Sequence, residues 1–542
     1  MHRIFVFLIA VGLLISCGRN GEPTLQSSSL IPLPSELKSG SGNFELVNNT
    51  MIYIPQQTEE WKNISSYLIG MLEPATGFQF TVQSGVGEKG ICFKSIDEKE
   101  LGDEGYRISI DEELITIASN QPQGAFRAIQ TLRQLLPATI ESNNIQNTSW
   151  KIPTGSIRDF PQYSYRGAML DVARHFFSVE EVKRYIDLIS IYKINFLHLH
   201  LSDDQGWRIE IKSWPNLTQV GGQTEVGGGQ GGFYTQEQYT EIIRYAQTRY
   251  ITIVPEIDMP GHINSALASY GELNGGTIVP AEGKLVVAAN ANKILDGKSN
   301  PTDLYTGIKV GWSTLRLEKE ATMRFVSDVI RELSALTPGP YFHIGGDEAK
   351  VTKKEDYIQF INRFQDLVKA NGKTMMGWEE IAQGEIAGET VVQFWNADKY
   401  TSMASEKGSK ILMSPAKKAY LDMSYDSTSK YGLHWAAYIE VDSAYLWDPS
   451  TFVDGIAQEN IIGIEAPLWS ETISNMDEVE YLLFPRLPGY AEIGWTKTEA
   501  RNWDEYKIRL GKQAERFRLM NIDYYRSKKV PWVDGLNSVV GH

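Results

Sequence analysis

Upstream of about residue 157, hydrophobic residues alternate with polar ones in short runs such as Met51–Ile54. A period of two residues is typical of strands with one buried face. The runs Tyr106–Ile110 and Leu114–Ala118, separated by acidic turn residues, predict a hairpin, and hydrophobic positions from Ala125 to Leu136 recur at helical spacing. We therefore expect a small α+β domain over residues 30–157.

From Tyr165 onward the pattern changes to apolar strands that alternate with amphipathic helices, as in repeated βα units. Eight such strands predict an α/β fold, a (β/α)8 TIM barrel over residues 158–525, followed by a C-terminal tail over 526–542. The strands are expected near Tyr165–Val172, Asn195–Ser202, Ile251–Asp258, Tyr341–Glu348, Thr374–Glu380, Thr390–Asn396, Lys410–Pro415 and Ile461–Glu471.

Two of the predicted helices have clear start signals. Ser178 is followed three residues later by Glu181, and Thr235 by Gln238, which are capping boxes ahead of apolar periodic runs. The last helix of the barrel is expected near Met476–Glu492, before a polar stretch that has room for one more short helix.

The barrel predicts where a functional site lies, because sites in this fold form at the carboxyl ends of the strands. Acidic residues, histidines and tryptophans gather at nearly all of those ends rather than scattering over the helices. This clustering favours a site for carbohydrate, although any one tryptophan is as common in a plain core.

The strongest local signal is the segment Tyr341–Glu348, in which Gly345 and Gly346 precede Asp347 and Glu348. Two glycines permit an irregular backbone at a strand end, which can aim two successive acidic side chains at one ligand. Two adjacent carboxylates also influence each other's protonation, so one of them could stay neutral and act as an acid.

Composition and charge narrow the class of protein. The chain has 542 residues, 42% of them hydrophobic, and a formal net charge of −15, which is unfavourable for binding nucleic acid. Only Cys17 and Cys92 are present, and we expect Cys92 to be a small buried strand residue.

The N-terminal residues resemble an export signal. A basic start and the apolar run Ile4–Ile15 lead to Leu14-Ile15-Ser16-Cys17, which resembles a bacterial lipobox. The resemblance implies a lipoprotein signal peptide over residues 1–16, a lipid-modified Cys17 and a polar tether over 17–29. We therefore expect an exported protein that is lipid-anchored to a bacterial membrane, in the periplasm or at the cell surface.

Five segments together resemble glycoside hydrolase family 20, the β-N-acetylhexosaminidases. The resemblance covers nearly the whole mature chain. It implies an exo-acting enzyme that removes terminal non-reducing β-linked GlcNAc or GalNAc from oligosaccharides or glycoconjugates, without a cofactor or metal. The matching segments are Arg166–His175, His198–Arg208, Pro255–His262, Leu304–Gly307 and Tyr341–Glu348.

The resemblance also implies catalytic roles. Glu348 would be the general acid and base, Asp347 would orient the 2-acetamido group, and Tyr420 would hold the acetamide oxygen. Neighbouring residues approach a sugar from one side, so Asp347 and Glu348 are poorly placed to straddle it as a conventional retaining pair would. The acetamide oxygen would attack instead and form an oxazolinium intermediate. From the sequence alone Asp204, Asp422 and Glu471 stay open as enzymic nucleophiles.

Substrate-binding residues follow from the same resemblance. Arg166 would bind O3 and O4 of the sugar, Glu471 would bind O4 and O6, and Asp422 is counted with them. His262 and one aspartate of the pair Asp203-Asp204, for which we favour Asp204, would form a relay to the acid. Three tryptophans would enclose the N-acetyl group and the ring face, namely Trp378, Trp395 and Trp469.

Two alternatives remain at this point. A non-catalytic glycan-binding surface lipoprotein is disfavoured because both acids and Tyr420 are present. A metal-dependent barrel hydrolase would use His198 and His200, which share a strand face, but the other histidines do not complete a ligand set. The glycine-rich stretch 221–232 lacks the features of a phosphate-binding loop and is expected to be a flexible loop near the pocket.

Overall fold

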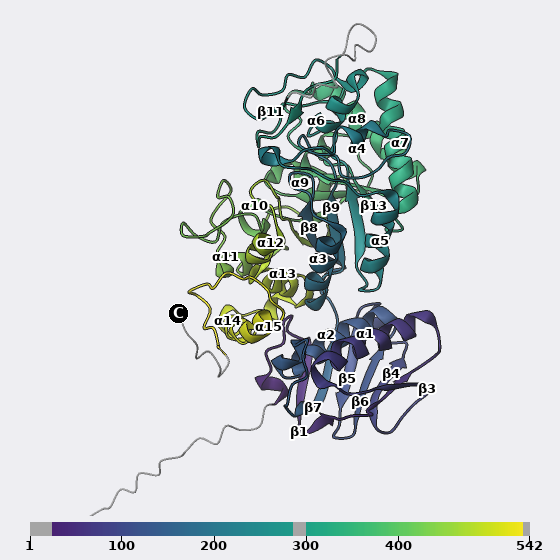
Figure 1. Cartoon of the computed structure of the whole chain (residues 1–542), viewed down its shortest axis with the longest axis vertical. Coiled ribbons are helices and arrows are strands. Elements are labelled where there is room, and N and C mark those ends of the chain that lie inside the picture. The colour runs from purple at the N-terminus through teal and green to yellow at the C-terminus, as the bar shows by residue number, and fades with distance from the viewer. Residues whose placement is uncertain (1–23, 286–299, 535–542) are drawn as a thin grey trace, which may run out of the picture.

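The computed structural model describes residues 24–285 and 300–534, which form two domains. A small N-terminal domain lies below a larger barrel domain in Figure 1, with its helices α1 and α2 on the side facing the barrel. The α+β domain and the TIM barrel predicted from the sequence are both confirmed.

The N-terminal domain is a seven-stranded sheet in the order β1-β7-β5-β6-β4-β2-β3, with helices α1 and α2 packed against it. Strands β5 and β6 pair antiparallel, as the predicted hairpin requires, and Cys92 is fully buried on β4. The strands are β1 Glu36–Leu46, β2 Met51–Ile54, β3 Thr81–Ser84, β4 Gly90–Ser95, β5 Tyr106–Ile110, β6 Leu114–Ser119 and β7 Trp150–Asp159, and the helices are α1 Glu59–Thr76 and α2 Pro122–Leu135.

The N-terminal boundary differs from the prediction. Leu25 is completely buried in the core of the small domain, so the last part of the tether predicted over 17–29 belongs to the folded domain. A single leucine in a polar stretch gave no periodic signal, and the burial of Leu25 depends on strands far away in sequence. The first residues of that tether, Cys17 and the signal peptide lie outside the described residues.

The barrel closes in the order β10-β13-β14-β15-β16-β17-β8-β9, with all neighbours parallel. All eight predicted strands are confirmed, which places their carboxyl ends in one ring. The strands are β8 Tyr165–Asp171, β9 Phe196–His200, β10 Thr252–Glu256, β13 Tyr341–His343, β14 Thr374–Trp378, β15 Val391–Phe394, β16 Lys410–Met413 and β17 Ile461–Ala466.

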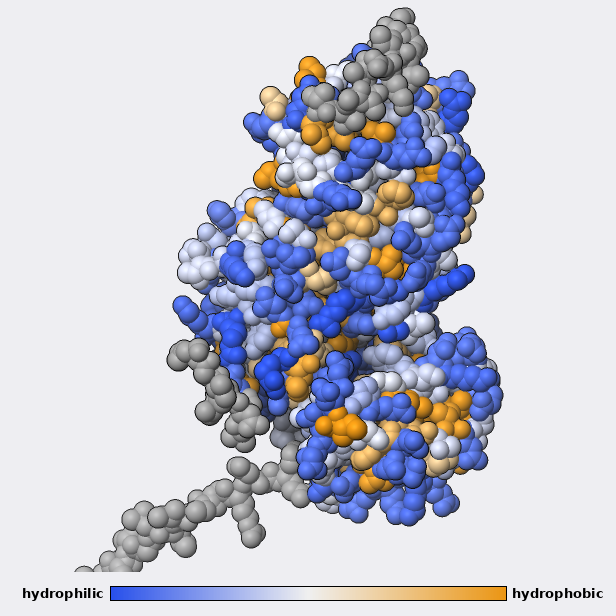
Figure 2. Space-filling model, viewed as in Figure 1, coloured by the Kyte–Doolittle hydropathy of each residue, from blue (hydrophilic) through white to orange (hydrophobic). Residues whose placement is uncertain are grey.

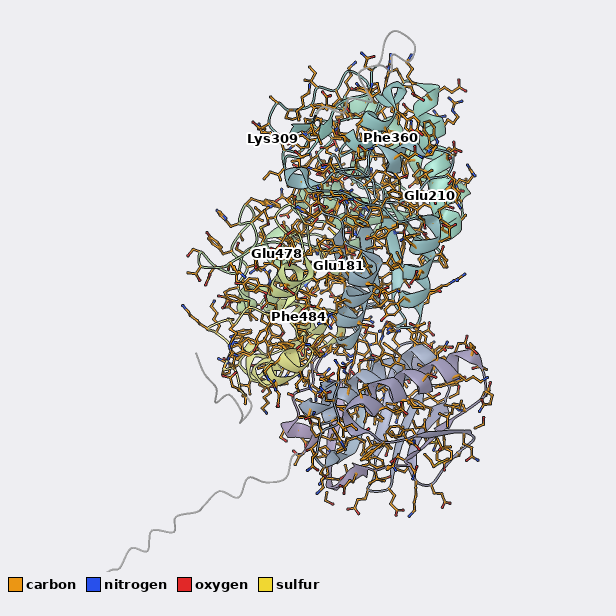
Figure 3. The ribbon with its side chains drawn as sticks, in the orientation of Figure 1. Glu181, Glu210, Lys309, Phe360, Glu478 and Phe484 are labelled. Carbon is orange, nitrogen blue, oxygen red and sulfur yellow. The ribbon has the colours of Figure 1, made fainter. Side chains whose placement is uncertain are left out.

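Helices surround the barrel. Both capping boxes are present, and Glu181, labelled in Figure 3, closes the one at the start of α3. The helices up to the last strand are α3 Val179–Ile191, α4 Asn216–Gln219, α5 Gln236–Gln247, α6 Asn264–Ser269, α7 Glu320–Leu336, α8 Lys354–Ala370, α9 Asp398–Glu406, α10 Ala416–Ala419 and α11 Val441–Tyr445, and a short hairpin joins β11 Lys284–Leu285 to β12 Leu304–Tyr305.

The C-terminal part corrects two predictions. The helix expected over Met476–Glu492 is two helices, separated at Phe484 (Figure 3) and Pro485, because proline cannot donate the backbone hydrogen bond that a continuous helix needs. Val530 is buried, so part of the predicted tail packs on the barrel domain. The four helices after β17 are α12 Met476–Leu483, α13 Arg486–Trp495, α14 Trp503–Gly511 and α15 Ala514–Leu519.

The surface is largely hydrophilic on the face shown in Figure 2, with hydrophobic residues scattered over both domains. Within residues 24–285 and 300–534, no helix is both long enough and apolar enough to span a membrane.

Candidate active site

The acidic pair lies on a loop directly after β13, which ends at His343, earlier than the predicted strand. Gly345 and Gly346 have φ values of 67° and 95°, in the left-handed region that favours glycine. A Cβ atom on Gly345 would lie 1.9 Å from Oδ1 of Asp258. Glu348 itself has a φ of 44°, an unusual conformation for a side chain other than glycine, and such conformations gather at functional sites.

Asp347 is held by Asp258, which follows β10. The two carboxyl groups share a hydrogen bond, and burial followed by the charge of Asp347 raises the pKa of Asp258 well above its usual range. Asp258 therefore keeps the proton and donates a hydrogen bond to Asp347. Oδ1 of Asp347 is buried and has no hydrogen-bond partner within the described part of the chain. This oxygen is free to accept a hydrogen bond from a ligand.

Glu348 has two cationic neighbours. The Nζ atom of Lys350 lies 2.7 Å from Oε1, and Nε2 of His262 lies 3.6 Å from Oε2. Burial alone would raise the pKa of Glu348, but the nearby cation of His262 and the ion-paired Lys350 outweigh it and lower the pKa to about 2. Of the adjacent pair, it is thus Asp347 whose pKa is raised by burial, while Glu348 is a carboxylate in this ligand-free state.

The relay behind Glu348 runs through Asp203. Nδ1 of His262 lies 3.1 Å from Oδ1 of Asp203, whose other oxygen lies 2.8 Å from Nε2 of His200. Our preference for Asp204 was wrong. Its Oδ1 instead accepts hydrogen bonds from the backbone of Asn264 and from Ser313, which turns Asp204 away from His262.

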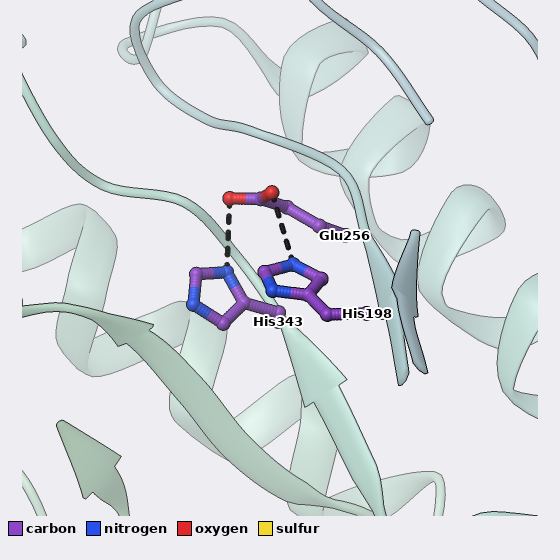
Figure 4. A group of neighbouring side chains, drawn as sticks. All are labelled: His198, Glu256 and His343. Atoms are coloured by element: carbon purple, nitrogen blue, oxygen red, sulfur yellow. Dashed lines mark ion pairs between the residues drawn. The ribbon is translucent and has the colours of Figure 1, made fainter. Parts of the chain in front are cut away.

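Glu256, His198 and His343 form a buried cluster inside the barrel (Figure 4), and His200 connects Glu256 to Asp203 of the relay. Glu256 contacts His198 at 3.0 Å, His343 at 3.0 Å and His200. Burial opposes protonation of His198 and His200, yet the glutamates beside them raise the two pKa values to about 9 and about 10. Ligand atoms of His198, Glu256 and His343 lie close enough to hold a metal ion, but metals bind unprotonated imidazole. A hydrogen-bonded network therefore accounts for these residues better than a metal site.

The sugar-binding arginine was wrongly predicted. Arg166 is completely buried near the start of β8, where its guanidinium binds Glu104 of the N-terminal domain and the backbone oxygens of Tyr163 and Lys193. It lies at the amino end of the strand and cannot reach the opposite mouth of the barrel.

Arg174 occupies the place predicted for Arg166. Its guanidinium lies 2.8 Å from Asp203, 3.3 Å from Asp171 and 4.9 Å from the ring of Trp469, and Glu471 adds to the negative charge around it. The positions of the two arginines in the sequence already distinguish Arg174 from Arg166. Arg166 and Arg174 are eight residues apart, and the first is at the beginning of a predicted strand whereas the second follows its end.

Four aromatic side chains line the late strand ends. The rings of Trp378 and Trp469 are 5.7 Å apart, and Trp469 is 6.2 Å from Tyr420. Trp395 is partly buried and donates a hydrogen bond of 3.2 Å from Nε1 to Glu380. The structure thus brings Trp378, Trp469 and Tyr420 together, as predicted, with Trp395 connected to Tyr420 through the exposed Trp435.

Asp422 is buried and Glu471 is partly buried; the two side chains lie near each other, and Glu471 also lies near Arg174. Burial, followed by the charge of Glu471, raises the pKa of Asp422 well above its usual range. Both carboxylate oxygens of Asp422 and one oxygen of Glu471 have no hydrogen-bond partner among residues 24–285 and 300–534. Buried polar atoms are rarely left unpaired in proteins, so these atoms are suited to bind a polar ligand.

The predicted site omitted four contributors. Arg174, Asp203 and Asp258 lie inside the segments that resemble the family. Arg166 was predicted in place of Arg174 and Asp204 in place of Asp203, and Asp258 was given no role. Lys350 follows the acidic pair by two residues and gave no signal beyond an ordinary surface lysine. Only the spatial arrangement assigns it to Glu348.

Family models match both domains. The model of the Glycosyl hydrolase family 20 catalytic domain matches residues 163–498, and that of domain 2 of the same family matches residues 27–160. The two matches follow the division between the barrel and the small domain.

Similar proteins share this arrangement. The chain is 36% identical to the β-N-acetylhexosaminidase of Cellulomonas fimi over 93% of this chain and 97% of that protein. It is 33% identical to a β-hexosaminidase of Porphyromonas gingivalis, over 92% of this chain but only 64% of that protein. Among solved structures, the family 20 β-N-acetylhexosaminidase of Streptomyces coelicolor matches with a TM-score of 0.87 and 44% identity, covering 93% of this chain and 99% of that chain. A mutant Streptomyces plicatus β-hexosaminidase in complex with its product GlcNAc matches with a TM-score of 0.88 and 44% identity, covering 94% and 99%.

Proposed function

The chain belongs to glycosyl hydrolase family 20, and from that premise we propose how the residues of this site carry out the reaction. The protein is a β-N-acetylhexosaminidase, an exo-acting enzyme that removes terminal β-linked N-acetylhexosamine. What remains to be assigned is the role of each side chain, the preferred sugar and the cellular location.

The acetamide oxygen of the substrate is the nucleophile in this proposal. Asp347 accepts a hydrogen bond from the acetamide N–H through its unpaired Oδ1, which turns the acetamide oxygen toward the anomeric carbon. Asp258 supports this orientation because its proton bonds to Asp347 and leaves that side chain anionic. Tyr420 binds the acetamide oxygen from the other side. The nucleophile is then already in place before the reaction begins.

Glu348 transfers the proton to the departing oxygen. In the ligand-free state it is a carboxylate, and the proton resides on His262, whose pKa is raised despite burial by the charges of Asp203 and Asp347. A sugar that fills the pocket excludes water from Glu348 and raises its pKa, so that it takes up the proton. After the leaving group departs, the same carboxylate activates the water that opens the oxazolinium ring.

Sugar recognition relies on charged groups and ring faces. Arg174 donates to ring hydroxyls, while Asp422 and Glu471 form hydrogen bonds with hydroxyls through oxygens that have no protein partner in the described structure. Trp378 and Trp469 form an apolar wall for the N-acetyl methyl group and the ring face. These groups surround a single sugar, which is consistent with removal of one terminal residue.

One observation carries the proposal: most of the buried carboxylate oxygens without hydrogen-bond partners in the described residues belong to residues expected to touch the substrate. Of six such oxygens, four belong to Asp347, Asp422 and Glu471. Leaving such atoms unpaired costs free energy in an empty protein, and a polyhydroxylated ligand removes that cost.

The proposal is tested by replacing the acid. Glu348→Gln removes the group that transfers the proton, and general acid–base groups contribute about 10²–10⁴-fold. We expect release of nitrophenol from the β-N-acetylglucosaminide to fall by at least about 100-fold, while Glu385→Gln, at an exposed position, keeps full activity. Retention of wild-type turnover by Glu348→Gln contradicts the role given to this residue.

We infer that GlcNAc is accepted in the pocket, because the similar Streptomyces plicatus enzyme has been crystallised with GlcNAc. Whether GalNAc binds as well depends on how Arg174 and Glu471 contact O4. A panel of aryl β-glycosides of GlcNAc, GalNAc and glucose measures this preference, and the glucoside, which lacks the acetamide, is expected to be the poorest substrate.

We further propose that the enzyme is attached to a bacterial membrane through Cys17, on the basis of the sequence Leu14-Ile15-Ser16-Cys17. In cells, the protein is expected in the membrane fraction, and Cys17→Ser is expected to release it. Wild-type protein recovered with an unmodified cysteine or in the soluble fraction contradicts the anchor.

A further inference from the structure

Lys350 is the one cationic side chain on the exposed side of Glu348 in the described structure. Its ammonium lies 2.7 Å from Oε1 of Glu348, and 61% of its side chain is exposed. Oε2 of the same carboxylate faces the buried His262. Glu348 is thus held between an inner cation, which belongs to the relay, and an outer cation that has no part in the reaction described above.

The surrounding loop makes room for this contact. Gly311 has a φ of 77°, and a Cβ atom there would lie 2.7 Å from Cδ of Lys350 and 3.2 Å from the backbone oxygen of Glu348. The hydroxyl groups of Thr314 and Thr352, 2.7 Å apart, tie the two segments together. The bare face of Gly311 therefore allows the stem of Lys350 to lie beside Glu348.

The position of Lys350 relative to the reaction follows from the role of Glu348. The acid must touch the oxygen between the sugar in the pocket and the group that leaves. One face of Glu348 is occupied by His262 and Asp347 within the barrel, so the exposed face with Lys350 is turned toward the leaving group. Lys309, on the same loop as Gly311 and labelled in Figure 3, is paired with Glu282.

We propose that Lys350 recognises an anionic sugar on the leaving side of the bond, by binding its carboxylate or sulfate group. This inference rests on the proposed function, because it places the leaving group beside Glu348. It names the class of preferred substrate: N-acetylhexosamine β-linked to a uronic acid or to a sulfated sugar.

The exchange of partners is physically inexpensive. Ion pairs between exposed side chains are weak, so an anion on the substrate can take the ammonium from Glu348. Glu348 then loses the outer cation that stabilises its carboxylate, and it retains His262 on one side with the negative charge of Asp347 nearby. The loss favours uptake of the proton at the moment the leaving group is bound. A neutral leaving group must break the same ion pair without replacing it.

The test compares disaccharides that differ only in the charge of the leaving sugar. Wild-type enzyme and Lys350→Met are assayed with GlcNAc β-linked to glucose, to glucuronate and to a sulfated glucose. Lys353→Met, at an exposed position three residues away, is the matched control. We expect kcat/KM of the wild type and of the control to be roughly threefold higher for the anionic substrates than for the neutral one, because one exposed ion pair contributes about that much. Lys350→Met is expected to lose this preference. If only one of the two anionic substrates is preferred, that result identifies whether Lys350 binds a carboxylate or a sulfate group.

A second readout separates recognition from general damage to the site. With a neutral aryl substrate, the basic limb of the kcat/KM profile reports loss of the proton that His262 holds for Glu348. Loss of the positive charge of Lys350 beside this pair makes the pair bind that proton more tightly, so the basic limb moves to higher pH by roughly half a unit. An unchanged charge preference in Lys350→Met, or an unmoved limb, overturns the inference. Absence of any turnover by the wild type on the aryl substrate instead contradicts the proposed function.

Discussion

Two arginines in one recognised segment show what decides a residue's role. Arg166 and Arg174 have the same side chain and lie eight positions apart, but β8 carries them to opposite ends of the barrel. Arg166 neutralises Glu104 beneath the barrel, and Arg174 meets Asp203 and Trp469 at its mouth. A motif identifies which segment matters, while the direction of the strand decides which member of it can touch the substrate.

This difference gives a prediction for paired variants. Arg174→Gln removes charged hydrogen bonds to the sugar, worth about 1.5–3 kcal/mol, so kcat/KM of the folded protein should fall by about 10- to 100-fold. Because Arg174 is also paired with the buried Asp203 and Asp171, this variant loses stability as well. Arg166→Gln leaves a buried charge less well compensated, so the free energy of unfolding should fall by about 3 kcal/mol while the folded fraction keeps its activity.

Aryl-glycoside kinetics and urea unfolding of both variants check the assignment. The reverse pattern, in which folded Arg166→Gln loses activity and folded Arg174→Gln keeps it, restores the prediction made from the sequence.

At the level of single residues, the sequence identified Asp347, Glu348, Tyr420 and the tryptophans as members of one site. It could not distinguish Asp203 from Asp204, because adjacent residues after a strand end differ in direction only through local hydrogen bonds. The contacts of Asp204 with Asn264 and Ser313 involve segments up to 109 residues away and determine that direction.

Among the elements, the strands and capped helices were predictable because their signals are local: an apolar run, or a serine followed by a glutamate three residues on. The early end of β13 was not, since the residues after His343 are apolar and small. Gly345 and Gly346 take left-handed conformations there, and the backbone N–H of Gly346 donates a hydrogen bond of 3.0 Å to Asp258, which follows β10 and is distant in the sequence.

Strand β9 carries a pH dependence of stability. The folded state binds the protons of His198 and His200 more tightly than the unfolded chain, with pKa values raised to about 9 and about 10. Their contribution is complete below about pH 6.5 and is lost as pH rises through those values. We expect the free energy of unfolding to fall between pH 7 and about pH 10, by on the order of 3 kcal/mol for each histidine.

Denaturant unfolding at the two pH values measures this loss. In His198→Gln, which cannot gain or lose that proton, the decrease should be smaller than in the wild type although the variant is less stable at pH 7. An equal decrease in both proteins would show that His198 is neutral in the folded state.

For the whole molecule, an ionic cluster joins the two domains. Glu104 of the small domain lies 2.7 Å from Arg166 of the barrel and 3.0 Å from Arg127, and Lys193 of the barrel lies 2.9 Å from Asp159. All five side chains are buried. Burying these charges is costly unless they are paired, so the two domains are coupled through them.

Glu104→Gln should therefore weaken that coupling. It leaves Arg127 and Arg166 buried without their shared counter-ion, which typically costs about 3–5 kcal/mol. In calorimetry we expect one unfolding transition for the wild type, and for the variant a lower melting temperature with the small domain unfolding first. Two separate transitions in the wild type, or an unchanged melting temperature in the variant, contradict the coupling.

The central claim is that the substrate's own acetamide oxygen attacks the anomeric carbon while Asp347 and Glu348 assist it. The most direct measurement compares kcat/KM for aryl β-glycosides whose N-acetyl group carries none, one, two or three fluorine atoms. Fluorine withdraws electrons from the acetamide oxygen without adding a charge. The account predicts a steep fall in rate with each fluorine, whereas a rate that is indifferent to fluorination would show that a protein carboxylate is the nucleophile.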